Sequence, residues 1–400
     1  MNIESYNPLA CEHCMKCMKA CPMDALHYVN DLPLIRKDKC IDCGKCLHVC
    51  PNNGFTIVSS KLEFNKNYKY TCVLIPVSFY TQFSDTIQMR KMEHAFHVLG
   101  FDEVVDLSLY NSAIMNNAVP FIKKYKNNYL LSSHCPSITK MIYHKYPGLV
   151  PYLIPMEYPS ELAARMKRKA IMEETGLKKE EIGIFLLCEC AAKLDLAKYP
   201  NGNMEYEVDH AIAVNSISAI LRKTMREVDG SAEEIELSKI GLLYDVKDGV
   251  QRMMEDYTII NVDSIDKATD VLELVEFERL QSSKYISMSA CSNGCVGGGL
   301  LWTNPFENRI QLEEIYKDAS DKVLDLSFEE VVRDIKPMDE QDLRTMKEKM
   351  DWFLRVKEIR EKLPGFDCGA CGFPNCLHMA EEIAKGHNQI EDCRIKAKKE

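Results

Sequence analysis

Two copies of one cysteine pattern near the start of the chain constrain its fold most strongly. Cysteines stand at 11, 14, 17 and 21 and again at 40, 43, 46 and 50, and Pro22 and Pro51 follow the two copies. The whole chain has 18 cysteines, and its first residues have no basic segment typical of a secretory signal. This usage favours ligation of clusters or metal ions in a reducing compartment over disulfides.

The spacing of these cysteines is that of bacterial ferredoxins with two 4Fe-4S clusters, in which the fourth cysteine of each copy reaches across to the other cluster. We therefore predict a ferredoxin-like α+β domain over residues 1–62. The ligands are predicted to be Cys11, Cys14, Cys17 and Cys50 for the first cluster, and Cys21, Cys40, Cys43 and Cys46 for the second. A pair of zinc knuckles is the alternative, although zinc does not require this spacing.

Length and charge narrow the remaining possibilities. The chain of 400 residues is long enough for two or three domains, and its net charge of −10 argues against a nucleic-acid partner. The longest apolar run, around residues 72–80, is too short to span a bilayer. We expect no membrane span and a cytoplasmic location.

After Ser60 the pattern alternates between apolar strands and amphipathic helices, which is typical of α/β lobes. We predict two lobes, at about 63–160 and 161–305. Strands are expected at 70–79, 128–133, 182–187, 258–262 and 285–288, and helices at 86–99, 161–179, 215–223, 250–254 and 268–280. Ligands of such sheets collect at the carboxyl ends of strands.

Three cysteine loops follow predicted strands. The loop at 289–299 reads Ser-Ala-Cys-Ser-Asn-Gly-Cys-Val-Gly-Gly-Gly, and its small residues allow the backbone to approach a bulky ligand. Its two cysteines, Cys291 and Cys295, are too few for a cubane cluster. The remaining ligands are expected from Cys135, in Ser-His-Cys-Pro, and Cys190, in Cys-Glu-Cys-Ala-Ala-Lys.

These loops, in this order, resemble the three signature loops of the catalytic domain of iron-only (FeFe) hydrogenases, and the resemblance covers about residues 66–300. It implies a two-lobed catalytic domain over 63–305. It also implies an H-cluster, in which Cys135, Cys190, Cys291 and Cys295 hold a 4Fe-4S cluster. Cys295 would bridge to a di-iron subcluster with carbonyl, cyanide and azadithiolate ligands, and Lys193 would contact a cyanide.

The sequence departs from the family pattern around these ligands, as in divergent sensory or uncharacterised groups. His134 replaces the proton-shuttling cysteine, Glu189 replaces a proline, and Cys188 and Ser289 replace methionines of the di-iron pocket. His134 either relays protons or only hydrogen-bonds the loop. Glu189 and Cys188 are alternative relays, and Cys188 is otherwise a space-filling core residue.

The carboxyl end carries another cysteine set. We predict a connector over 306–345 and a small helical domain over 346–400 with ligands Cys368, Cys371, Cys376 and Cys393. Their spacing resembles the single-cubane domain of electron-transfer and corrinoid iron-sulfur proteins, with zinc as the alternative. Gly369 and Gly372 are expected to let backbone amides point at cluster sulfurs.

The leading hypothesis is an FeFe-hydrogenase that interconverts dihydrogen with protons and electrons, with four 4Fe-4S clusters in all. Its partners would be a ferredoxin-type redox protein and hydrogenase maturation proteins. One alternative is a hydrogen or redox sensor with the same cofactor. The other is an iron-sulfur carrier or assembly factor that lacks the di-iron subcluster.

Overall fold

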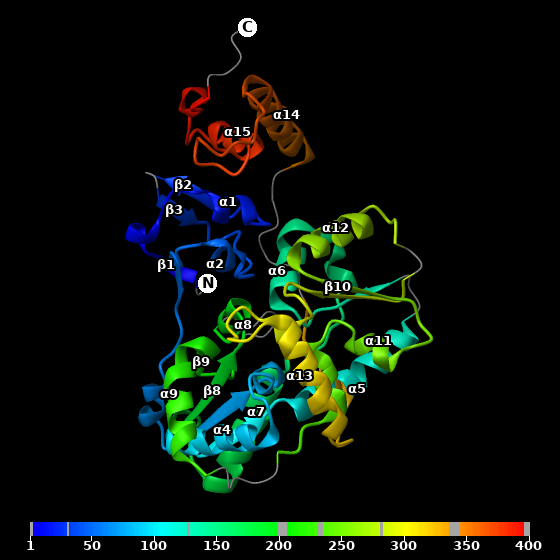
Figure 1. Cartoon of the computed structure of the whole chain (residues 1–400). Helices are drawn as coiled ribbons and strands as arrows, with labels where there is room; N and C mark the ends of the chain where they lie inside the picture. Colours follow the sequence, from blue (N-terminus) through cyan, green and yellow to red (C-terminus); the bar gives the residue numbers. More distant parts are fainter. Residues whose placement is uncertain are drawn as a thin grey trace.

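The computed structural model describes residues 3–29, 32–125, 129–198, 206–229, 235–280, 283–335 and 345–395. The chain forms an N-terminal domain, a larger central domain and a small C-terminal domain. In Figure 1 the N-terminal domain, in blue, lies between the central domain and the C-terminal helices, in orange and red.

The N-terminal domain contains two copies of one structural unit, which match the two copies of the cysteine pattern in its sequence. Strand β1 (Ile3–Tyr6) pairs antiparallel with β4 (Phe55–Ile57), and β2 (Leu26–Val29) pairs with β3 (Leu32–Ile35). Helices α1 (Lys16–Ala20) and α2 (Lys45–Val49) each contain the third cysteine of a copy and end at the fourth. Both helices begin after a residue in the left-handed conformation, which turns the cysteine loop sharply into the helix.

The central domain contains two parallel sheets. The first has the order β6-β5-β8-β9, and the second has the order β10-β11-β7. Their strands are β5 (Tyr70–Ile75), β6 (Glu103–Asp106), β7 (Leu130–Leu131), β8 (Ile182–Cys188), β9 (His210–Ala213), β10 (Ile259–Asp263) and β11 (Tyr285–Ser289). The predicted α/β class is confirmed.

The predicted boundary between the lobes at residue 160 is wrong, because the sheets exchange strands across it. β7 precedes this residue and joins β10 and β11, whereas β8 and β9 follow it and join β5. Parallel neighbours require a crossover connection, so strands adjacent in space need not be close in sequence. The predicted strands at 70–79 and 128–133 are also shorter in the structure, where they are β5 and β7.

Helices cover both sheets and bury one apolar core around each. The α-helices are α3 (Val77–Tyr80), α4 (Thr86–Val98), α5 (Ser108–Lys124), α6 (Pro136–Lys145), α7 (Pro159–Thr175), α8 (Ala191–Leu196), α9 (Val214–Glu227), α10 (Lys239–Leu242), α11 (Gly249–Met253), α12 (Ile265–Glu276) and α13 (Pro305–Asp318). The 3-10 helices are η1 (Pro8–Ala10), η2 (Leu62–Asn67), η3 (Pro147–Tyr152), η4 (Lys179–Glu181), η5 (Leu243–Asp245), η6 (Cys295–Gly297), η7 (Phe328–Glu330) and η8 (Ile390–Asp392).

The stretch 306–345 differs from the predicted connector, because most of α13 lies in it. Asn308 on this helix is buried, and its Nδ2 donates to the carbonyl of Val296 at 2.8 Å. The helix therefore supports the third cysteine loop. Residues 336–344 lie outside the described residues.

The C-terminal domain consists of α14 (Met346–Lys362), α15 (Cys376–Ala384) and the cysteine loop before α15. Val356 of α14 packs with Met379 and Ala380 of α15 in a separate small core. Across the described residues, no helix is both long enough and apolar enough to span a membrane.

One glycine fixes how α10 packs on α5. A Cβ atom at Gly241 would lie only 1.8 Å from the carbonyl oxygen of Ser108. We expect Gly241→Ala to lower the free energy of unfolding by about 1–3 kcal/mol, because the backbone has to shift to relieve this overlap. Chemical denaturation followed by circular dichroism measures the change. Gly148→Ala is the control, since no atom lies within 4 Å of its Cβ position, and an equal loss in both variants would contradict the packing argument.

Candidate functional site

The three cysteine loops of the central domain lie at the carboxyl ends of strands, as predicted. Cys135 follows β7 and is the residue immediately before α6, and Cys190 stands in the same position between β8 and α8. Cys291 and Cys295 follow β11, and Cys295 begins η6. The loops thus carry four thiols to one region between the two sheets.

The four thiols lie near one another in a dry environment. Burial raises the pKa of Cys190 to about 12, and Glu189 adds to this shift. Burial also raises the pKa of Cys291 well above its usual range, and the neighbouring Cys190 and Cys135 add to it. The pKa values of Cys135 and Cys295 are likewise raised, chiefly by burial. Buried thiolates need positive charge close by, so this donor set fits an iron-sulfur cluster, whose iron would supply that charge.

Lys193 supplies the cation nearest these thiols. Burial alone would lower its pKa, but Cys295, Glu189 and Asp245 raise it well above its usual range. Its ammonium forms an ion pair with Glu189, which is fully buried. Asp245 is held in place by a hydrogen bond from the backbone amide of Ser78 at 3.0 Å. The lysine expected to contact a cyanide is therefore already paired with Glu189, and the charge of Asp245 also acts on it.

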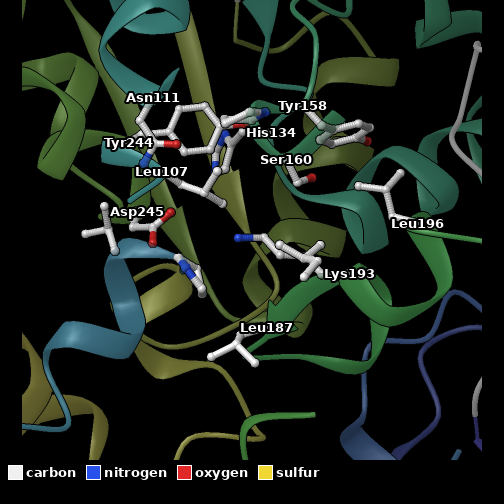
Figure 2. A pocket seen from close by; sticks show the side chains of 14 residues that line it. Leu107, Asn111, His134, Tyr158, Ser160, Leu187, Lys193, Leu196, Tyr244 and Asp245 are labelled. Carbon is white, nitrogen blue, oxygen red and sulfur yellow. The ribbon is translucent and has the colours of Figure 1, made fainter. Parts of the chain in front are cut away.

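A small cavity lies beside this lysine. Lys193 and Asp245 direct their charged groups towards its middle in Figure 2, where His134 and Tyr244 lie across from the lysine. Apolar walls come from Leu187 and neighbouring leucines. The ammonium of Lys193 in this cavity would suit an anionic ligand of a cofactor held by the four cysteines.

His134 lies between this cavity and a second small one, because it lines both. Its Nε2 lies 3.1 Å from the hydroxyl of Ser289, and its ring meets that of Tyr244 edge-on at 5.9 Å. Burial, with the charge of Lys193, lowers the pKa of His134 to about 4. The imidazole is therefore neutral at physiological pH.

Cys188 lies apart from this arrangement. Its side chain is fully buried in the core of the first sheet, and its thiol donates to the carbonyl of Leu186 at 3.8 Å. It does not line either of the two cavities beside His134. These contacts favour the space-filling alternative over a relay.

The glycine run of the third loop packs closely against protein. A Cβ at Gly297 would lie 2.0 Å from the carbonyl oxygen of Ser292, and one at Gly298 would lie 2.5 Å from that of Glu189. A Cβ at Gly299 would lie 2.2 Å from Nε2 of His48 in the N-terminal domain. Close backbone packing accounts for these glycines, so they are not evidence for a large ligand.

Cys21 lies close to the other three cysteines that the spacing predicts for the second cluster. Cys21 adds to the raised pKa of Cys40, Cys43 and Cys46, whose shifts are caused chiefly by burial. Cys43 in turn adds to the raised pKa of Cys291 in the central domain. The second N-terminal cysteine set therefore lies next to the central one.

A charged contact fixes this junction. The ammonium of Lys140, on α6, lies 3.0 Å from Asp42 and also pairs with Asp195 on α8. Asp42 lies between two cysteines of the N-terminal loop and is only 1% exposed. One lysine thus connects the helices behind Cys135 and Cys190 to the N-terminal domain.

The four C-terminal cysteines line one cavity of about 310 Å³. They are Cys368, Cys371, Cys376 and Cys393. Among the described residues, no three His, Cys, Asp or Glu side chains converge closely enough to hold a single metal ion.

Sequence reasoning missed Tyr244 and Asp245. Both belong to η5, and no motif surrounds them in the sequence. They reach the site only because η5 packs behind it, next to α10 and α11. The single signal in the sequence was an aspartate within an otherwise apolar stretch. The structure shows that this aspartate is buried.

Family models match three parts of the chain. Residues 69–241 match the family described as iron only hydrogenase large subunit, C-terminal domain. Residues 3–51 match a 4Fe-4S dicluster domain, and residues 363–395 match a family described as a putative Fe-S cluster. The three matches cover the three domains in the order predicted.

Solved FeFe-hydrogenases share the fold. One, studied for oxygen inactivation of its H cluster, superimposes with a TM-score of 0.50 at 13% identity, covering 66% of this chain and 89% of that one. A variant of FeFe-hydrogenase HydA1 from Chlamydomonas reinhardtii gives the same values. At this identity the likeness shows the fold alone.

Curated relatives match a short segment. One component of an ion-translocating oxidoreductase complex from Rhodobacter capsulatus is 50% identical over 38 residues, which is 10% of this chain and 20% of the relative. An uncharacterised protein of Methanocaldococcus jannaschii is 47% identical over 38 residues, 10% of this chain and 17% of the relative. The chain spans no more than about a fifth of the length of these relatives.

The C-terminal cysteine set allows a direct test. We expect Cys368→Ser to lose about four iron atoms per chain, one cubane, because one ligand of a four-thiol site is removed. Iron and sulfide analysis of the anaerobically purified protein measures the loss. Cys72→Ala is the control, since Cys72 lies in the core of β5 and is fully buried. Unchanged iron in the Cys368 variant would exclude a C-terminal cluster.

Proposed function

We propose that this chain, whose residues 69–241 match the iron-only hydrogenase family, interconverts dihydrogen with protons and electrons. The observation that best supports the proposal is the buried cavity that holds Lys193, whose ammonium is coupled to Cys295. Cys135, Cys190, Cys291 and Cys295 would hold the cubane of an H-cluster, and Cys295 would also face the di-iron subcluster.

The di-iron subcluster, when bound, supplies the open coordination position at which dihydrogen is split. The protein supplies position and electrostatic field. Lys193 donates from its ammonium to an anionic ligand in a dry pocket, where such a contact is strong. Leu107, Leu187 and Leu196 line the same cavity and exclude water from it.

His134 is the proposed proton relay. Its ring borders both cavities, and its Nε2 and the Ser289 hydroxyl form a hydrogen-bonded pair that can pass a proton between them. Electrons would pass through the N-terminal and C-terminal 4Fe-4S clusters to a ferredoxin-type protein. We further propose that maturation proteins supply the di-iron subcluster and that the protein works in the cytoplasm.

One observation favours the second candidate, an iron-sulfur carrier without the di-iron subcluster. Glu189 already pairs with Lys193, and Asp245 is close to the same ammonium. An anionic cofactor ligand therefore has to compete with two carboxylates for one cation. The same competition would make turnover slow if the cofactor does bind.

Infrared spectroscopy distinguishes the two candidates. The anaerobically prepared full chain is loaded with a synthetic di-iron cofactor that carries carbonyl and cyanide ligands. We expect sharp carbonyl and cyanide bands that shift under hydrogen, because the four buried cysteines and Lys193 lie together in the same region. An absence of bands, with the cubane iron still present, would overturn the hydrogenase proposal in favour of the carrier.

The relay predicts the effect of two substitutions. His134→Ala should slow isotope exchange between deuterium gas and water by about 100-fold in the loaded protein, because a positioned acid-base group is lost. Ser289→Ala should slow it less, since the imidazole remains. Mass spectrometry of the gas measures exchange, and iron content and infrared bands should stay unchanged. His97→Ala on α4 is the control, and unchanged exchange in His134→Ala would eliminate this residue as the relay.

A further inference from the structure

The C-terminal cysteine loop lies directly against the N-terminal domain. The backbone amide of Tyr28 on β2 donates to the carbonyl of Gly372 at 2.7 Å. The ring of Phe373 stacks on His27 with centroids 6.0 Å apart and planes 12° apart. In Figure 1 this places α15 just above β2 and α1. Polar and stacking contacts thus join the two domains beside Cys371.

Two glycines permit this close approach. Gly372 has a φ of +90°, and a Cβ there would lie 2.6 Å from the carbonyl oxygen of Tyr28. Gly369 has a φ of +79°, and a Cβ there would lie 2.7 Å from the terminal methyl carbon of Met18. Both conformations favour glycine. The loop is therefore shaped to fit the first N-terminal cysteine loop.

Tyr28 touches both cysteine sets. Its hydroxyl lies 3.7 Å from Sγ of Cys17, and its pKa is raised first by burial and then by Cys17 and Cys11. Both cysteines belong to the predicted first cluster. The backbone of the same residue bonds to Gly372, which follows Cys371. A single residue therefore connects the ligand loops of two predicted clusters.

The second N-terminal cysteine set faces the central domain and not the C-terminal cysteine loop. Cys43 lies near Cys291 and packs with Cys135 against the core of the second sheet. The order in space is therefore the C-terminal set, the first N-terminal set, the second N-terminal set and the central site. This order does not follow the sequence, in which the C-terminal set comes last.

We propose that the C-terminal cluster exchanges electrons directly with the first N-terminal cluster, and that Tyr28 is the positioning residue that joins them and tunes the first cluster. One electron leaves the reduced C-terminal cluster and enters the oxidised first cluster. An external one-electron donor of the ferredoxin class then reduces the C-terminal cluster again. The inference rests on the iron-sulfur part of the proposed function and is independent of the di-iron subcluster.

The hydroxyl of Tyr28 has a defined effect on the first cluster. A hydrogen bond donated to a cluster thiolate stabilises the reduced, more negative state and so raises the reduction potential. Tyr28→Phe removes this donor and keeps the ring and the backbone contact to Gly372. The reduction potential of the first cluster should therefore become more negative, while the potentials of the other clusters stay unchanged.

Redox titration with dithionite, followed by electron paramagnetic resonance, tests this on the full chain with its iron-sulfur clusters and without the di-iron subcluster. Tyr6→Phe is the matched control in the same domain, because the Tyr6 hydroxyl has no hydrogen-bond partner among the described residues and its ring packs on Phe55. A shift in Tyr28→Phe alone supports the proposal. An absence of shift, or an equal shift in Tyr6→Phe, overturns the role of Tyr28.

The contact between the clusters is tested separately. In the fully reduced protein we expect magnetic coupling between the C-terminal and first clusters, and Gly372→Val should reduce it because the added side chain overlaps Tyr28. If the Gly372 variant loses iron, the coupling is measured in His27→Ala instead, since this substitution removes only the stacking on Phe373. An absence of coupling in the unsubstituted protein of full iron content overturns the direct exchange, and coupling that persists unchanged in the variants overturns the role of these contacts in positioning the clusters. An inactive hydrogenase site would leave both measurements unaffected.

Discussion

The central site depends on compensating the free-energy cost of burying four thiolates away from water. Burial raises the pKa of Cys135, Cys190, Cys291 and Cys295 together, so four negative sulfurs are tolerated only beside positive charge. The loops therefore meet between two sheets that exchange strands, where a cluster can sit in a fixed frame. Metal binding and folding are coupled in such a site, because the ligand set is costly without its metal.

Charge also distinguishes this site from the hydrogenase pattern that its loops resemble. Lys193 and Asp245 line the pocket, and the ammonium of Lys193 also forms an ion pair with Glu189. An anionic cofactor ligand meets a cation whose charge is already partly balanced, which weakens the contact without removing it. If the proposed cofactor binds, slow chemistry and a reduced affinity for it would have the same physical origin.

The sequence was informative where the chemistry is local. Cysteine spacing predicted Cys21 with Cys40, Cys43 and Cys46, because ferredoxin loops fix their own ligand geometry. The apolar runs in the sequence predicted that each of the three central cysteine loops follows a strand. The strand exchange, Asp245 and the packing of Gly299 on His48 could not be predicted, because each depends on contacts between segments far apart in the chain.

The contacts of His48 and Lys140 make the N-terminal domain part of the wall of the central site. His48 lies against Gly299, and Lys140 connects Asp42 to the helices behind Cys135 and Cys190. Chemical damage in the N-terminal domain therefore also disturbs the central site. If oxygen destroys the second N-terminal cluster, the loop that carries Asp42 loses its shape, and the central ligands lose their support. We expect such a protein to lose its clusters together rather than one at a time.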